Sequence, residues 1–97
     1  MILVFGGTTE GRIAAQTLDA AGNPFYYSTK GELQEMELCN GERLCGAMDA
    51  CNVVELCREN DVKLIVDAAH PFAQGVHNTV YEASVELGIP VVRYERE

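Results

Sequence analysis

Positive charge is scarce in this 97-residue sequence, where seven Lys and Arg stand against 15 Asp and Glu and the formal net charge is −8. Such a surface repels nucleic acid and anionic membranes, because both bind basic patches. No apolar run approaches the roughly 20 residues of a membrane span. The apolar start, Met1–Phe5, is too short for a signal peptide. These absences predict a cytoplasmic protein with neither nucleic acid nor membrane as a partner.

The sequence also lacks the cysteine and histidine spacings of metal sites. No C-x-x-C pair is present, and neither His70 nor His77 stands at zinc-finger spacing. If Cys51 and Cys57 share a helix, they lie about 120° apart around its axis and cannot easily converge on one ion. We therefore interpret all four cysteines as free, buried or half-buried thiols in a reducing compartment and expect no metal. They are Cys39, Cys45, Cys51 and Cys57.

Short apolar runs alternate with helical patterns along the chain. Strands are expected at Ile2–Phe5, Phe25–Ser28, Leu64–Val66 and Pro90–Tyr94. A first helix is expected from about Glu10 to Ala21, capped by Thr8 or Thr9, with Ile13, Ala14, Leu18 and Ala21 on its apolar face and Gly22 after its end. A second begins near Asp49 and places Ala50, Val53, Val54 and Cys57 on one stripe. A third carries Val76, Val80, Ala83 and Leu87 and ends at Gly88.

The segment Glu35–Cys45 has no clear single pattern. Met36 and Leu38 alternate with acidic residues, as in a half-exposed strand. Asn40-Gly41 is a strong hairpin signal, so a strand pair is the alternative to a single strand here.

This alternation predicts an α/β fold in one domain, residues 1–97. It is a Rossmann-like, doubly wound, mostly parallel sheet of about five strands with helices on both faces. Ligands of such sheets bind beyond the carboxyl ends of the strands. Four loops are expected there: Gly6–Arg12, Ser28–Gly31, Asp67–Ala73 and Tyr94–Glu97.

The loop GGTTEGR resembles two phosphate-binding motifs and completes neither. Gly6 and Gly11 match the outer glycines of G-x-G-x-x-G, but Thr8 stands at the middle one. The spacing also fits the start of a P-loop, yet Arg12-Ile13 replaces the Lys-Ser/Thr that nucleotide hydrolysis requires. The remaining candidate is an anion site at a helix N-terminus; the alternative is a plain strand–helix turn.

The end of the second strand lacks the acid that holds the ribose diol of NAD. Ser28, Thr29 and Lys30 supply two hydroxyls and a cation instead, a composition that favours NADPH over NADH. The alternative is that Lys30 is a solvated turn residue.

In Asp67–Ala73, Pro71 suits the first turn of a helix. His70 would then point from the ligand edge of the sheet toward a nicotinamide or a substrate carboxylate. Capping the helix or bonding to Asp67 is the competing interpretation of His70. No nucleophile stands beside a base, so covalent catalysis has no support.

Taken together, ILVFGGTTEGR, STKG, VDAAHPFA and VVRYERE resemble the precorrin-6A and cobalt-precorrin-6A reductase family. Two positions depart from its usual pattern, Ala69 in place of Thr and Glu97 in place of Pro. The resemblance implies an NAD(P)H-dependent reductase of a C=C bond in a tetrapyrrole of cobalamin biosynthesis. It also implies that this chain is the N-terminal domain of two, with substrate bound between them and the isolated domain inactive.

Residue roles follow from the resemblance alone. The pyrophosphate region would be held by Gly6, Gly7, Thr8, Thr9, Gly11 and Arg12. The adenosine ribose end would be held by Ser28, Thr29, Lys30 and Gly31. Near the nicotinamide and substrate would lie Asp67, His70, Pro71 and Phe72, with Asp67 and His70 facing substrate. The competing function is a small α/β interaction or regulatory domain with a degenerate nucleotide loop.

Overall fold

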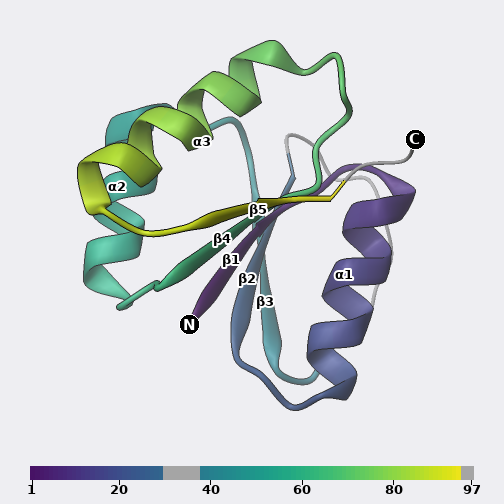
Figure 1. Ribbon diagram of the computed structural model, residues 1–97. Coiled ribbons are helices and arrows are strands. Elements are labelled where there is room, and N and C mark those ends of the chain that lie inside the picture. The colour runs from purple at the N-terminus through teal and green to yellow at the C-terminus, as the bar shows by residue number, and fades with distance from the viewer. Residues whose placement is uncertain (30–37, 95–97) are drawn as a thin grey trace.

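Strands and helices alternate along most of the computed structural model, which describes residues 1–29 and 38–94 (Figure 1). The strands are β1 (Ile2–Phe5), β2 (Phe25–Thr29), β3 (Gly41–Cys45), β4 (Leu64–Asp67) and β5 (Val91–Arg93). The helices are α1 (Thr9–Ala20), α2 (Ala50–Glu59) and α3 (Gln74–Leu87). The predicted α/β fold is confirmed, with helix and strand ends within a residue or two of the expected ones for most elements.

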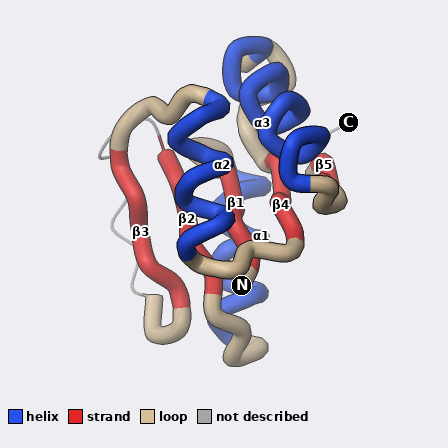
Figure 2. The backbone as a smooth tube through the Cα atoms, turned by 90° about the vertical axis from the view of Figure 1, so that its left-hand side faces the viewer, coloured by secondary structure: helices blue, strands red, loops and turns tan. Residues whose placement is uncertain are grey.

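All five strands are parallel, in the order β3-β2-β1-β4-β5. Helix α1 covers one face of the sheet, and α2 and α3 cover the other (Figure 1). Figure 2 looks onto the α2 and α3 face, with α1 behind the sheet. The connection from β1 to β2, through α1, therefore crosses one face of the sheet. The connection from β4 to β5, through α3, crosses the other face. The point where strand order reverses lies beside β1, as in other doubly wound sheets.

Two separate cores fix these layers. Side chains alternate between the faces of a strand, so Leu3 and Phe5 face α2 and α3 whereas Val4 faces α1. The α2 and α3 side is the larger core and includes Val53 and Val80, both almost fully buried. Burial of Cys57 in this core raises the pKa of its thiol to about 11. Cys39, Cys45 and Cys51 are free but exposed, so the prediction of buried or half-buried thiols is wrong for these three.

Helix α1 lies on the sheet through small residues. Gly11 and Ala15 are its buried positions. Ile13 is 45% exposed, so the apolar face predicted for this helix is wrong at that position. Ala21 is exposed too, whereas Leu18 packs against the core on this face of the sheet as predicted.

The predicted hairpin at Asn40-Gly41 is also wrong. Gly41 begins β3, which pairs in parallel with β2; Glu35–Glu37 lie outside the described residues. The Asp19 carboxylate at the end of α1 accepts the backbone N–H groups of Asn40 at 2.7 Å and Cys39 at 3.1 Å. The turn amides thus bind a helix side chain instead of closing an antiparallel turn.

No helix in the described ranges is long and apolar enough to cross a membrane.

The Asp19 contact predicts a specific loss of stability in acid. The N–H groups of Asn40, Cys39 and Gly41 hold the pKa of Asp19 below its usual 3.8. Its stabilising contribution is therefore complete above that value and is lost as the pH falls through the lower folded-state pKa. We expect Asp19→Asn to unfold at lower urea concentration than wild type near neutral pH, with the difference shrinking in acid.

The control for Asp19→Asn is Glu55→Gln, which removes an exposed carboxylate on α2. Urea midpoints for the three proteins are compared near neutral pH and down to strong acid. An Asp19→Asn deficit of equal size at every pH would contradict the assignment.

Candidate functional site at the carboxyl edge of the sheet

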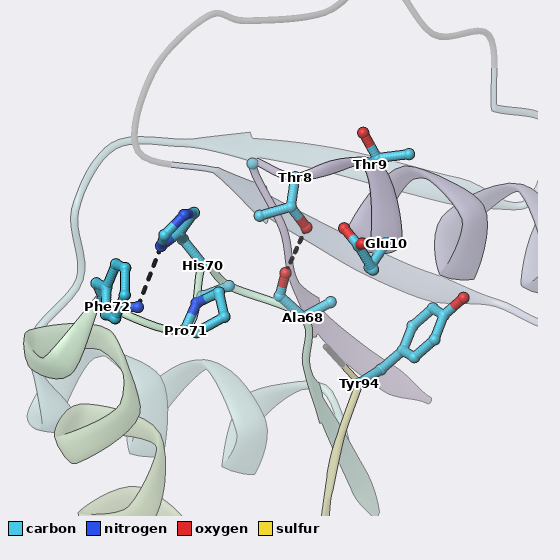
Figure 3. Close-up of a pocket in the computed structure, with 10 residues that line it drawn as sticks. Thr8, Thr9, Glu10, Ala68, His70, Pro71, Phe72 and Tyr94 are labelled. Atoms are coloured by element: carbon cyan, nitrogen blue, oxygen red, sulfur yellow. Dashed lines mark hydrogen bonds between the residues drawn. The ribbon is translucent and has the colours of Figure 1, made fainter. Parts of the chain in front are cut away.

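Thr8 joins the loop after β1 to the loop after β4. Its backbone is extended, and its side-chain oxygen accepts the Gly11 N–H at 3.0 Å, which caps α1. The same hydroxyl donates to the carbonyl of Ala68 at 2.6 Å (Figure 3). One side chain thus caps the start of the helix and connects two loops that are 60 residues apart in the chain.

The three glycines of the first loop serve three different purposes. A Cβ on Gly6 would lie 2.2 Å from the Tyr27 ring, so this position must stay bare to let the ring pass beneath the loop. A Cβ on Gly11 would lie 2.8 Å from the Gly6 Cα, which reflects close packing of α1 on β1. Gly7 has a φ of +101° and open space around it, so it is needed for the turn itself.

The loop after β4 is held from below by a buried pair. Nδ1 of His77 lies 2.6 Å from the Asp67 carboxylate, and Nε2 lies 2.9 Å from the His70 carbonyl oxygen. The other Asp67 oxygen accepts the Ala69 N–H at 3.2 Å. Both side chains are buried, with 8% of His77 and 4% of Asp67 exposed. The competing prediction that His70 bonds to Asp67 is wrong, because His77 takes that place.

The turn around Pro71 differs from the sequence prediction. Helix α3 begins at Gln74, so Pro71 precedes it and does not lie in its first turn. The Gln74 N–H donates to the Phe72 carbonyl at 2.9 Å, and Ala73 between them has φ −81° and ψ 66°. This is an inverse γ-turn, which interrupts helical geometry before α3 starts.

His70 and Phe72 lie at the exposed tip of this loop (Figure 3). The Phe72 N–H donates to Nδ1 of His70 at 3.1 Å, and their rings are 5.2 Å apart. Because Nδ1 accepts a hydrogen bond, a neutral His70 carries its proton on Nε2. Phe72 is 85% exposed. The loop therefore presents an N–H donor and a bare aromatic ring at the carboxyl edge of the sheet.

Two adjoining clefts open at this edge. The β4 cleft, of about 500 Å³, lies between the start of α1 and residues 68–72, with Tyr94 at its side (Figure 3). The β2 cleft, of about 640 Å³, extends from the glycine loop over β2 to the starts of α2 and α3. Gly7, Thr8, Ala69 and His70 line both clefts. The glycine loop and the His70 loop thus form the boundary at which the two cavities meet.

Most of the predicted site residues meet at these clefts. Those that line at least one of them are Gly6, Gly7, Thr8, Thr9, Ser28, Thr29, His70, Pro71 and Phe72. Lys30 and Gly31 lie outside the described residues. Gly11 is buried, Arg12 is half-buried on α1, and neither lines a cleft. Asp67 lines neither cleft and is buried beneath the loop.

The sequence prediction missed one wall of the β2 cleft. The loop Gly46–Asp49 after β3 contributes to it, together with Asn52 of α2 and Gly75, Val76 and Thr79 of α3. The β3 loop was overlooked because the hairpin interpretation directed that strand away from the parallel edge. A parallel strand at Gly41–Cys45 would have placed Gly46 at the ligand side.

Charge in the clefts comes from few side chains. Within the described part of the chain, Glu10 and Asp49 line them and no Lys or Arg does. Asp49 caps α2 in a reciprocal arrangement with Asn52, so a carboxylate already occupies that helix start. Thr8 caps α1 without charge. The α1 N-terminus therefore has no capping carboxylate, although Glu10 in its first turn adds a negative charge beside the positive dipole end.

Comparison with known proteins adds to this geometry. The sequence model of the family described as precorrin-6x reductase CbiJ/CobK matches residues 1–97. The chain belongs to this family.

Individual members of the CbiJ/CobK family align along almost the whole chain. The cobalt-precorrin-6A reductase of Priestia megaterium is 33% identical, over 99% of this chain and 38% of its own length. The precorrin-6A reductase of Rhodococcus erythropolis is 36% identical, over 98% of this chain and 39% of its own. The solved structure of the precorrin-6A reductase CobK superposes with a TM-score of 0.87 at 27% identity, covering 99% of this chain and 39% of that one. The chain thus spans about two fifths of the length of these relatives.

The fit between Gly6 and Tyr27 yields a prediction for stability. Gly6→Ala should lower the free energy of unfolding by about 3 kcal/mol, because the added methyl group overlaps the tyrosine ring. The double mutant Gly6→Ala, Tyr27→Leu should be more stable, by at least about 1 kcal/mol, than the sum of the two single-mutant losses predicts.

The control for Gly6→Ala is Gly22→Ala, where φ is +79° and no atom lies within 4 Å of the added Cβ. That change should cost about 1 kcal/mol through backbone strain and should be additive with Tyr27→Leu. Urea unfolding of the two cycles measures both couplings. Additivity of Gly6→Ala with Tyr27→Leu would remove the packing explanation.

Proposed function

We propose that this chain is the nicotinamide-nucleotide-binding domain of a reductase that acts on precorrin-6A or cobalt-precorrin-6A. The observation that carries the proposal is the α1 N-terminus, capped by the neutral Thr8, at the junction of two clefts on the carboxyl edge of the sheet. Two cavities joined at a helix start suit a ligand with two ring systems and an anionic centre. The family membership supports the same conclusion.

The residues present fit such a cofactor in three parts. The backbone of Gly7–Thr9 at the start of α1 would hold the pyrophosphate, because the first N–H groups of a helix have no partner within it. The β2 cleft, with Ser28, Thr29 and the missed Gly46–Asp49 wall, would hold the adenosine half. The β4 cleft, with His70 and Phe72, would hold the nicotinamide half.

When bound, the cofactor supplies a hydride to a C=C bond of the tetrapyrrole. The chain's own residues supply position. His70 would donate its Nε2–H to a carbonyl or carboxylate oxygen of the nicotinamide or the substrate. Phe72 would offer its exposed ring to the face of a flat ligand. Asp67, which lines neither cleft, would act through the loop above it and not by direct contact.

We also propose that residues 1–97 form the first of two domains and that the substrate binds between them. The relatives are about two and a half times as long as this chain, since it covers 38% of the Priestia megaterium protein. Both clefts open on one edge of the sheet and leave the His70 and Phe72 side of the loop exposed. A second domain over this edge would exclude water from the reacting carbon.

Titration with NADPH tests nucleotide binding. We expect amide resonances of Gly6–Arg12 and of residues 68–73 to shift at millimolar nucleotide; no shift in the first loop with either NADPH or NADH would refute the proposal. Thr9→Asp sharpens the test, because a second acid in the first turn of α1, beside Glu10, favours the helix but repels an anion. It should weaken NADPH binding by about tenfold while leaving the unfolding midpoint equal or higher.

The matched control is Thr17→Asp, which adds the same charge at an exposed position near the other end of α1. Its NADPH affinity should equal that of wild type. Equal weakening by the two variants would indicate general charge repulsion and not a site at the helix start.

The preference for NADPH rests on Lys30, the cation that follows β2 in the sequence. Lys30→Ala should weaken NADPH by about tenfold and NADH hardly at all, because only NADPH carries the 2′-phosphate. Lys63→Ala is the matched control, since it removes an exposed lysine that pairs with Asp61 instead. Equal losses for the two nucleotides in Lys30→Ala would leave no basis for the NADPH preference.

A further inference from the structure

Both ring nitrogens of the buried His77 have a hydrogen-bonding partner. Its ring lies between the Asp67 carboxylate, 2.6 Å from Nδ1, and the His70 carbonyl oxygen, 2.9 Å from Nε2. The His70 carbonyl is a hydrogen-bond acceptor, and so is Asp67 in its ionised form. A neutral imidazole has one N–H and would satisfy only one of them, whereas the imidazolium has two and satisfies both. With Asp67 as its counter-ion, the charged ring is paired within the protein.

The two hydrogen bonds of His77 act on different segments. The bond to Asp67 attaches the first turns of α3 to the end of β4. The bond to the His70 carbonyl holds the tip of the loop, and the Ala69 N–H is in turn held by Asp67 at 3.2 Å. The loop backbone around Ala69 and His70 is therefore fixed from beneath by side chains that line neither cleft.

What this anchor positions is the functional face of the loop. His70 lines both clefts, and its ring orientation is set by the bond from the Phe72 N–H at 3.1 Å. Displacement of the His70 carbonyl would turn its side chain away from the junction of the clefts. Thr8 holds the same loop from its other side through the Ala68 carbonyl.

We propose that His77, as an imidazolium paired with Asp67, is a positioning residue that holds His70 at the junction of the two clefts. The hydrogen bonds by which His77 holds the loop lie within this chain and do not depend on a ligand. Its effect on ligand affinity rests on the proposed nucleotide-binding function. His77 touches neither cleft, so its role is exerted through the loop backbone.

The first test is the protonation of the two histidine rings in the wild-type protein, read from ¹H–¹⁵N correlations of the imidazole nitrogens. We expect two protonated nitrogens on His77 and, for neutral His70, one on Nε2. The His77 ring protons should exchange slowly with solvent, because the side chain is buried and only 8% of it is exposed. A single protonated nitrogen on His77 would overturn the proposal.

The second test separates the two bonds with two conservative variants. In His77→Gln the amide N–H reaches the place of Nε2 and retains the bond to the His70 carbonyl. In His77→Asn the amide reaches the place of Nδ1 and retains only the bond to Asp67. We expect His77→Gln to bind NADPH within about twofold of wild type and His77→Asn about tenfold more weakly, the loss of one hydrogen bond to the loop.

The matched control is Ser84→Ala on the same helix. Ser84 is buried, and its hydroxyl donates to the Tyr81 carbonyl at 2.8 Å, away from the loop. This variant should lower the thermal midpoint without changing NADPH affinity. If His77 were merely structural, both His77 variants would behave in the same way, with lower midpoints and unchanged affinity well below unfolding.

The outcomes distinguish this proposal from the proposed function. If wild type binds neither nucleotide, the proposed function fails, and the amide resonances of His70 and Phe72 still test the anchor. They should move in His77→Asn and stay near their wild-type positions in His77→Gln. Equal shifts in the two variants, or none in either, would overturn the positioning role.

Discussion

The hydroxyl of Thr8 is the contact on which the arrangement of the site depends. It accepts the Gly11 N–H and donates to the Ala68 carbonyl, so the start of α1 and the loop after β4 share one atom. Parallel pairing of β1 with β4 brings the two loops to the same edge, where the Ala68 N–H donates to the Phe5 carbonyl at 2.9 Å. This backbone bond and the Thr8 hydroxyl together set the separation of the loops. The junction of the two clefts follows from that separation, because both of its walls are attached to Thr8.

The electrostatics of the edge come from peptide groups more than from side chains. The chain carries a net charge of −8, and the described lining of the clefts contains Glu10 and Asp49 but no Lys or Arg. An acidic protein can still receive an anion where helix N–H groups converge, since their partial charges stay when side-chain cations are absent. The cap of α1 is neutral and that of α2 is acidic, and Glu10 in the first turn of α1 is the carboxylate that an anion at that helix start would meet.

The sequence predicted the architecture because apolar periodicity and helix caps are local signals. Thr8, Asp49 and Gly88 stand at helix ends as expected. The errors arose where a distant partner decided the outcome. Asn40-Gly41 has the composition of a tight turn, yet the Asp19 carboxylate, more than 20 residues away, binds its amides. His77 reads as an ordinary helix residue until the fold brings Asp67 beside it. The roles of Lys30 and Gly31 stay predictions.

The ring of Tyr27 beneath the glycine loop limits which substitutions residue 6 can accept during evolution. Gly6 is bare because the Tyr27 ring fills the space its side chain would need. The two positions are therefore tied together by volume, although neither is tied to a ligand by it. A lineage that shortened residue 27 would release residue 6 to vary. In sequences related to this one, a larger residue at the first glycine of the motif should thus occur only where the aromatic residue at position 27 has also been replaced.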